Sequence, residues 1–89
     1  MKCINIIVSG KVQGVFYRNF IKQHCSKAGI RGYVKNKRDG TVEIIAEVDA
    51  DQEKELMRQC WKGPMTAFIQ KVDVQEIENK EEFDGFDIR

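Results

Sequence analysis

The chain carries two glycines and an arginine in one short stretch, Gly10-Lys11-Val12-Gln13-Gly14-Val15-Phe16-Tyr17-Arg18. Before it, an apolar and β-branched run over residues 3–8 predicts a buried strand covering 2–9. After it, the pattern from about residue 19 to residue 28 predicts a helix that ends at Gly29. A loop between such elements can bind an anion, because its N–H groups and the helix N-terminus carry partial positive charge. The alternative is a plain turn, which accounts for roughly half of such loops.

Arg18 lies where the predicted helix begins, and its side chain suits an anionic ligand. A guanidinium can bind a phosphate or a carboxylate through two hydrogen bonds at once. The loop has neither the Lys-Ser/Thr ending of a nucleotide P-loop nor the spacing of a dinucleotide-binding loop, so neither nucleotide class gains support. Taken alone, an arginine is more often a surface or salt-bridge residue, and the prediction therefore depends on the loop around it.

The composition is that of one soluble globular domain, which we expect to span residues 1–89, with 42% hydrophobic and 33% charged residues. No apolar run approaches the ~20 residues of a membrane span, and no signal-peptide pattern opens the chain. Three cysteines, Cys3, Cys25 and Cys60, are far apart and match no metal-ligand spacing. We expect free thiols in a cytoplasmic protein; a single disulfide between two of the three is the alternative.

The net charge of +1 hides an asymmetry along the chain. Residues 1–38 contain nine Lys or Arg and no Asp or Glu, whereas residues 39–89 contain six Lys or Arg against fourteen Asp or Glu. A positive field around the loop would speed the encounter with a small anionic ligand. The alternative, that the two halves interleave in space and their charges partly cancel, is equally consistent with the sequence.

The remaining segments alternate between strand and helix signals. Strands are predicted over 30–38, 41–48 and 67–78, with 83–88 as a candidate short fifth strand. The acidic stretch from Asp49 to Glu53 predicts the start of a second helix, and Gly63-Pro64 predicts its end. Asp39-Gly40 predicts a type I′ hairpin turn, in which both central residues take positive φ. The order β-α-β-β-α-β predicts an α+β fold of the ferredoxin-like, split βαβ kind: an antiparallel sheet with two helices on one face.

Apolar residues recur at helical and strand spacing, and these patterns predict the core. The predicted core residues are Phe20, Ile21, Cys25, Ala28, Val42, Ile44, Ala46, Val48, Leu56, Met57, Cys60 and Trp61. His24, the only histidine, lies beside the stripe of the first helix, where a surface or boundary residue is far more common than a ligand.

Three segments resemble signatures of the acylphosphatase family. The loop from Gly10 to Arg18 is similar to the first signature, and Gly32-Tyr33-Val34-Lys35-Asn36-Lys37-Arg38-Asp39-Gly40-Thr41-Val42-Glu43 resembles the second. The Gly63-Pro64 turn is also similar, and all three occur in the order and at the spacing of the family, whose fold is ferredoxin-like. Two departures concern substrate fit more than reaction type: Tyr17 replaces the usual Phe or Met, and Val48 replaces a frequent Gly.

The resemblance implies hydrolysis of a small acyl phosphate to a carboxylate and inorganic phosphate, with no metal, no cofactor and no covalent intermediate. It implies that Arg18 binds the phosphate and that Asn36 orients the attacking water. The phosphate-binding set that it implies, mostly through main-chain amides, is Gln13, Gly14, Val15, Phe16, Tyr17 and Arg18. On composition alone, Asn36 would be a strand-end or turn residue beside Asp39-Gly40. We expect a monomer without a nucleic-acid or membrane partner.

Few groups suffice for such a reaction. A carboxylate leaves without needing a proton, and a loose phosphoryl-transfer transition state mainly requires positioning and stabilisation of the equatorial oxygens. A guanidinium and a ring of N–H donors can stabilise that charge, and an asparagine amide can position water, since it both accepts and donates hydrogen bonds.

Two other interpretations are weaker. Cys25, followed by five residues and Arg31, resembles the loop of cysteine-dependent phosphatases, but Cys25 falls within a helical apolar stripe rather than at a strand end. An RNA-binding module of the same fold would carry aromatic residues on its central strands, and the strands predicted over 2–9 and 41–48 contain none.

Overall fold

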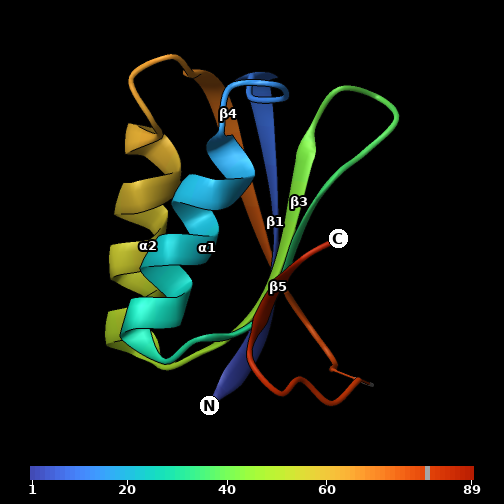
Figure 1. Ribbon diagram of the computed structural model, residues 1–89. Coiled ribbons are helices and arrows are strands. Elements are labelled where there is room, and N and C mark those ends of the chain that lie inside the picture. The colour runs from blue at the N-terminus through green and yellow to red at the C-terminus, as the bar shows by residue number, and fades with distance from the viewer. Residues whose placement is uncertain (80) are drawn as a thin grey trace.

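A computed structural model describes residues 1–79 and 81–89, and Figure 1 shows a sheet with two helices on one side of it. The elements are β1 (Lys2–Lys11), α1 (Tyr17–Ala28), β2 (Arg31–Asn36), β3 (Val42–Val48), α2 (Ala50–Lys62), β4 (Phe68–Ile77) and β5 (Phe86–Ile88). The strand order is β4-β1-β3-β2-β5. The predicted ferredoxin-like α+β fold and its short fifth strand are therefore confirmed.

The sheet is mixed rather than wholly antiparallel, which corrects one part of the prediction. Strands β4, β1, β3 and β2 pair in antiparallel fashion, but β5 pairs with β2 in parallel, with Val34 opposite Ile88. Residues 83–85, predicted as part of the fifth strand, precede it instead. Phe83 is buried with Cys3 and Ile45 in a small second cluster on the sheet face away from the helices.

Strand β1 continues two residues beyond the predicted end, because a β-bulge between Ser9 and Gly10 shifts its register against β4. A Cβ atom on Gly10 would lie 2.1 Å from the carbonyl oxygen of Phe68, so only glycine fits at this contact. The bulge thus lets β1 run up to the loop while it stays paired with β4.

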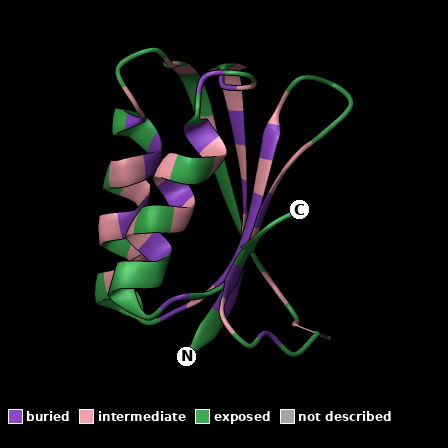
Figure 2. Ribbon diagram, viewed as in Figure 1, coloured by how far each residue is buried: buried purple, intermediate pink, exposed green. Residues whose placement is uncertain are grey.

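The main core lies between the helices and the sheet, as the buried inner stripes in Figure 2 show. The predicted alternation on β3 is confirmed, since Val42, Ile44, Ala46 and Val48 are all buried. The predicted stripes of the helices are confirmed for most members: Ile21, Cys25, Leu56 and Cys60 are buried, and Phe20 and Met57 pack against the core.

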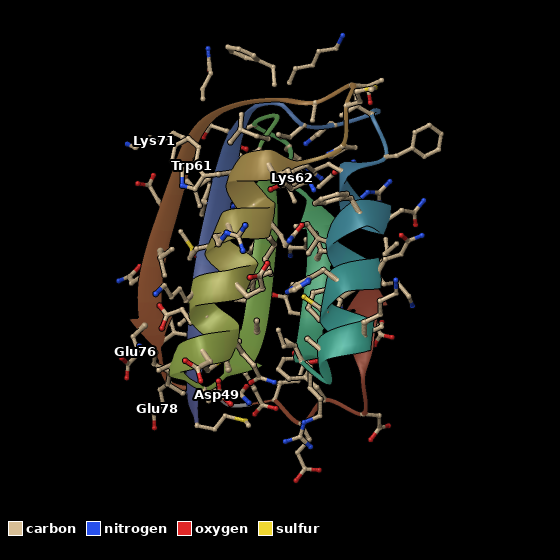
Figure 3. The ribbon with its side chains drawn as sticks, turned by 90° about the vertical axis from the view of Figure 1, so that its left-hand side faces the viewer. Asp49, Trp61, Lys62, Lys71, Glu76 and Glu78 are labelled. Carbon is tan, nitrogen blue, oxygen red and sulfur yellow. The ribbon has the colours of Figure 1, made fainter. Side chains whose placement is uncertain are left out.

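Two residues predicted to lie in the core are exposed. Ala28 is the last residue of α1, where the helix leaves the core. Trp61 is 50% exposed because it follows Cys60 on the helix and therefore turns away from the sheet; Figure 3 shows it near the C-terminal end of α2 on the side of β4.

The hairpin between β2 and β3 is confirmed, but the predicted type I′ turn is wrong. Lys37 N donates to Thr41 O at 2.8 Å, so three residues form the loop. Gly40 has a φ of 92°, whereas Asp39 is not among the residues with positive φ. This is the three-residue kind of hairpin, in which only the last loop residue needs a left-handed conformation. The Asp39 carboxylate accepts from Thr41 N and Oγ1, which stabilises the turn.

Helix ends follow the predicted signals. Gly29, with a φ of 71°, ends α1. Its left-handed conformation lets Ile30 N donate to the carbonyl oxygen of Cys25 at 2.9 Å. Asp49 and Gln52 form a reciprocal capping box at the start of α2. In the described part of the chain, no helix is long and apolar enough to cross a membrane.

The hydroxyl of Tyr17 has a partner inside the core. It donates to the carbonyl oxygen of Cys60 at 2.8 Å. Cys60 lies in the last turn of α2, so no N–H group of the helix donates to its carbonyl oxygen. The Tyr17 hydroxyl supplies the missing hydrogen bond. Burial is the main reason why the pKa of the Tyr17 hydroxyl lies well above its ordinary range. The group therefore stays protonated and remains a hydrogen-bond donor.

Replacing Tyr17 by phenylalanine should lower the free energy of unfolding by about 1–3 kcal/mol, because it leaves a buried carbonyl without a donor. Urea denaturation would measure the change. Tyr33→Phe is the matched control: its hydroxyl donates to Glu43 at 3.3 Å in a half-buried position, so the expected loss is smaller. Equal losses for the two variants would contradict this account of Tyr17.

Candidate active site

The predicted anion loop lies at one end of the molecule, between the last residue of β1 and the first of α1. The β2–β3 hairpin and the connection from α2 to β4 lie at the same end, as Figure 1 shows. Thr66, from the second of these connections, donates its Oγ1 proton to the carbonyl of Val15 at 3.1 Å. The loop is therefore held by neighbouring segments.

Two residues of the loop take left-handed backbone conformations. Gly14 has a φ of 73°, which costs glycine nothing. Phe16 has φ 63° and ψ 18° and forms the N-cap of α1, where its carbonyl accepts the first helical hydrogen bond, from Phe20 N at 3.0 Å. No side chain among the described residues caps this helix end. The turn therefore leaves the first N–H groups of α1 facing outward from the helix end.

The backbone N–H groups of residues 14–18 form a continuous run of donors. Within the described part of the chain, none of them donates to a backbone or side-chain acceptor. Unpaired amides at a helix N-terminus, where the helix dipole adds partial positive charge, are well suited to an anion. Five of the six predicted phosphate-binding residues, Gly14 to Arg18, supply these donors.

A cavity of about 280 Å³ opens at this loop. Its lining residues are Val12, Gly14, Phe16, Tyr17, Arg18, Asn19 and Ile88. Arg18 is half-buried, and no carboxylate among the described residues lies within ion-pair distance of its guanidinium. The cationic head group is thus available to a ligand in the cavity.

Asn36 is the last residue of β2, and its side chain faces the helix side of the sheet. Side chains two positions apart on a strand share a face, and Val34 is fully buried in the main core beneath the helices. Because α1 begins at the end of the molecule where β2 ends, Arg18 and Asn36 lie at the same end and on the same face of the sheet. Asn36 is not among the residues that line the cavity itself.

The side-chain oxygen of Asn36 is buried without a donor. No donor in the described part of the chain lies within hydrogen-bond distance of Oδ1. A buried acceptor in this state costs about 1–3 kcal/mol, which is unusual for a residue that serves only as a strand end.

The Gln13 side chain joins the loop to the hairpin that follows Asn36. Its Nε2 donates to the carbonyl of Lys37 at 2.7 Å and to that of Thr41 at 2.9 Å. These two carbonyls lie on either side of the three-residue turn. The Gln13 carboxamide therefore bridges the two strands of the hairpin and connects the hairpin to the loop. Sequence reasoning placed Gln13 in the site through its main chain, and nothing in the pattern indicated this side-chain role.

Charged side chains separate along the length of the molecule. The two halves of the chain do interleave, since strands from both alternate in the sheet. The element ends nearest the loop nevertheless carry mostly cations, namely Lys11, Arg18, Lys37, Arg38, Lys62 and Lys71. The opposite ends carry more acids, including Glu47, Asp49, Asp51, Glu53, Glu76 and Glu78. Cations lie there too, and two of them form ion pairs: Lys2 with Glu53 and Arg31 with Glu47. Figure 3 shows Lys62 and Lys71 at one end and Asp49, Glu76 and Glu78 at the other. The positive field that this creates surrounds the loop.

The cysteine-phosphatase interpretation is wrong. Cys25 lies inside α1 and is fully buried, and burial is the main cause that raises the pKa of its thiol far above the ordinary value. A nucleophilic thiolate needs the opposite shift. All three cysteines are free, and no group of three His, Cys, Asp or Glu side chains among the described residues is arranged to hold a metal.

Three lining residues, Val12, Asn19 and Ile88, lie outside the predicted phosphate-binding set, and of these Ile88 is the one far from the loop in sequence. It lies in β5, seventy residues after Arg18, and reaches the cavity only because β5 pairs with β2. No local pattern signals such a contact.

Fold and loop together define a split βαβ domain with a turn of unpaired backbone N–H groups at the start of its first helix. Comparison with known proteins narrows this class. The acylphosphatase family model matches residues 4–88. The acylphosphatase of Marinobacter nauticus is 43% identical over 82 residues, which cover 92% of this chain and 89% of that protein.

Solved structures of acylphosphatases have the same fold as this chain. The crystal structure of acylphosphatase from Bacillus subtilis has a TM-score of 0.93 and 32% identity, covering 100% of this chain and 99% of that one. An acylphosphatase from Coxiella burnetii has a TM-score of 0.91 and 36% identity, covering 99% and 92%. The chain belongs to the acylphosphatase family and is a hydrolase of that class.

Proposed function

We propose that this protein hydrolyses the carboxyl–phosphate bond of acyl phosphates by direct attack of water, giving a carboxylate and inorganic phosphate without a metal or cofactor. The observation that carries the proposal is the run of unpaired N–H groups over residues 14–18, next to a guanidinium with no carboxylate partner among the described residues. The family of the chain supports the same reaction.

The loop amides and Arg18 bind the phosphoryl group. The five N–H donors of residues 14–18 and a forked guanidinium surround the equatorial oxygens, on which charge resides in a loose transition state. The donors are held in place before substrate arrives, because Gly14, the Thr66 contact and the start of α1 fix the course of the loop. Preorganised donors of this kind lower the barrier without reorganisation during the reaction.

Asn36 positions the attacking water. Its Oδ1 accepts a hydrogen bond from the water once the carboxamide turns toward the cavity, which satisfies an oxygen that has no donor among the described residues. An amide has no useful basicity, so the water attacks without prior deprotonation. A loose transition state tolerates a neutral nucleophile.

No general acid is needed for a carboxylate leaving group. The one titratable lining side chain besides Arg18 is that of Tyr17, and its hydroxyl points into the core toward Cys60. An alkyl phosphate ester, whose alkoxide leaves only with a proton, should therefore be a poor substrate.

The test is a hydrolysis assay on benzoyl phosphate in the presence of EDTA, with an alkyl phosphate ester as comparison. We expect turnover of the acyl phosphate that EDTA does not reduce, and little turnover of the ester. Activity that requires an added divalent metal, or equal rates on the two substrates, would contradict the proposal.

Gln13→Glu should lower kcat on the order of 10²-fold. A carboxylate cannot donate to the carbonyls of Lys37 and Thr41 and is repelled by them, so the loop and the hairpin separate and the water is misplaced. Steady-state kinetics would show the loss, and the inhibition constant of inorganic phosphate should change far less. Gln70→Glu adds the same charge at an exposed position at the start of β4 and is the matched control. A similar fall in that variant would attribute the effect to charge alone.

The same reasoning supports one catalytic unit over residues 1–89, acting as a monomer on a small molecule. Both parts of the site come from elements that pack around one core. The central strands β1 and β3 carry no aromatic side chain on which a nucleic acid base could stack. Three free, buried thiols suit the reducing cytoplasm.

A further inference from the structure

The cavity at the loop is larger than a phosphoryl group requires. Its volume of about 280 Å³ is many times the ~10–15 Å³ that a cavity needs to hold one water molecule. A phosphate has only five non-hydrogen atoms. The remaining space must receive whatever is attached to the phosphate, which under the proposed function is the acyl group.

Two apolar side chains from different elements border this remaining space. Phe16, from the loop, is 76% exposed, and Ile88, from β5, is 37% exposed. Val12, also a lining residue, is buried. Exposed apolar groups beside a cationic cavity are desolvated favourably by an apolar ligand, whereas they offer nothing to the phosphate.

The backbone at Phe16 gives an independent reason to assign its side chain a role. A φ of 63° is a left-handed conformation that glycine and asparagine adopt readily but that is a true outlier for a bulky residue. Burial does not compensate for this conformation, since most of the ring faces solvent. An exposed aromatic side chain held in an unfavourable conformation at a cavity indicates a contact with ligand.

Ile88 is fixed in place by main-chain pairing. It lies opposite Val34 in the parallel β2–β5 ladder, and the next residue, Arg89, donates its N–H to Val34 O at 2.8 Å. The Arg89 guanidinium also lies 4.2 Å from the centre of the Tyr33 ring. The last strand thus holds one apolar side chain at the cavity.

We propose that Phe16 and Ile88 form an acyl-binding subsite that favours acyl phosphates with an aromatic or branched apolar acyl group. The inference rests on the proposed function, because the phosphate held by the loop decides where the acyl group lies. An aromatic ring between the two side chains contacts the face or edge of Phe16 and the methyl groups of Ile88. A small acyl group such as acetyl reaches neither well.

The experiment measures binding of two phosphonates that cannot be hydrolysed, benzylphosphonate and methylphosphonate, by isothermal titration calorimetry. We expect the unmodified protein to bind benzylphosphonate more tightly. Phe16→Asn, which tolerates the left-handed backbone, and Ile88→Thr, which keeps the β-branched shape, should each reduce this preference by about 3- to 10-fold. Phe68→Asn is the matched control, because Phe68 is 64% exposed and does not line the cavity; its preference should equal that of the unmodified protein.

The outcomes separate the subsite from the reaction. An unchanged preference in both the Phe16 and the Ile88 variants, or an equal fall in the Phe68 variant, overturns the subsite while methylphosphonate binding and acetyl phosphate turnover still support the proposed function. Failure of the folded, unmodified protein to bind methylphosphonate overturns the phosphate site, and the subsite with it. Circular dichroism of each variant identifies those that have not folded.

Discussion

Arg18→Ala should lower kcat/KM for an acyl phosphate by about 10²–10³-fold or more, the range found when one preorganised donor is removed from a catalytic site. In the proposed mechanism the guanidinium forms two hydrogen bonds with the phosphoryl oxygens, and these bonds strengthen as charge develops on the oxygens. Steady-state kinetics on benzoyl phosphate would measure the loss. The inhibition constant of inorganic phosphate should rise as well, because the same group binds the product.

Arg18→Lys distinguishes charge from geometry. Lysine keeps the positive charge but cannot form the planar, two-pronged contact, so its rate should lie between those of the unmodified protein and the alanine variant. Arg58→Ala is the matched control, since Arg58 pairs with Glu55 on the exposed surface of α2 and should affect nothing. Turnover by Arg18→Ala at the unmodified rate would remove this residue from the mechanism.

Asn36→Ala should lower kcat by about 10²–10³-fold and leave the inhibition constant of inorganic phosphate nearly unchanged. We expect kcat and the inhibition constant to respond differently because, in the proposed mechanism, the side chain positions water rather than phosphate. The same change should keep or raise the melting temperature, since it removes a buried oxygen that has no donor among the described residues. A residue whose loss stabilises the fold and abolishes turnover is retained for function.

Asn5→Ala is the matched control for this variant. Asn5 is also a half-buried strand asparagine, but its Nδ2 donates to Glu43 at 3.0 Å on the face of the sheet away from the helices. Its replacement should lower stability modestly and leave kcat unchanged. Equal activity of the two variants would contradict the role of Asn36, as would an Asn36→Ala protein that loses both stability and phosphate affinity.

The order of elements could be predicted because its signals are local. Gly29 and the Asp49–Gln52 pair mark helix ends through the backbone and side-chain geometry of a few neighbouring residues. The alternation along β3 similarly follows from a period of two. Each of these predictions can be made without information on what packs against the helix or strand.

The features that could not be predicted depend on tertiary placement. Trp61 fits an apolar helical stripe, but Cys60 takes the position that faces the sheet, and Trp61, the next residue, turns toward solvent. Asp39-Gly40 is compatible with two hairpin turns, and the hydrogen bond between Lys37 and Thr41 selects the longer one. Ile88 reaches the cavity through the parallel pairing of β5 with β2, two strands far apart in the sequence. A pattern within one segment contains no information on these contacts.

Asn36 shows both what the local sequence can predict and what only the tertiary structure adds. By itself it is a common type of residue next to a turn, and only its resemblance to the family signature made it a candidate for catalysis. The register of β2 adds what the sequence lacks: a carboxamide on the helix side of the sheet, at the end where α1 begins, with an oxygen that is buried and unpaired within the described residues.

The excess of cations at one end and of acids at the other gives a nearly neutral protein a dipole along its length. An isoelectric point near 7.7 would suggest weak retention on any ion-exchange resin at neutral pH. We expect instead that a cation exchanger retains the protein by one pole, and that millimolar inorganic phosphate elutes it earlier than chloride of equal ionic strength. Near a phosphorylated surface, the same dipole would turn the molecule so that its catalytic end approaches first.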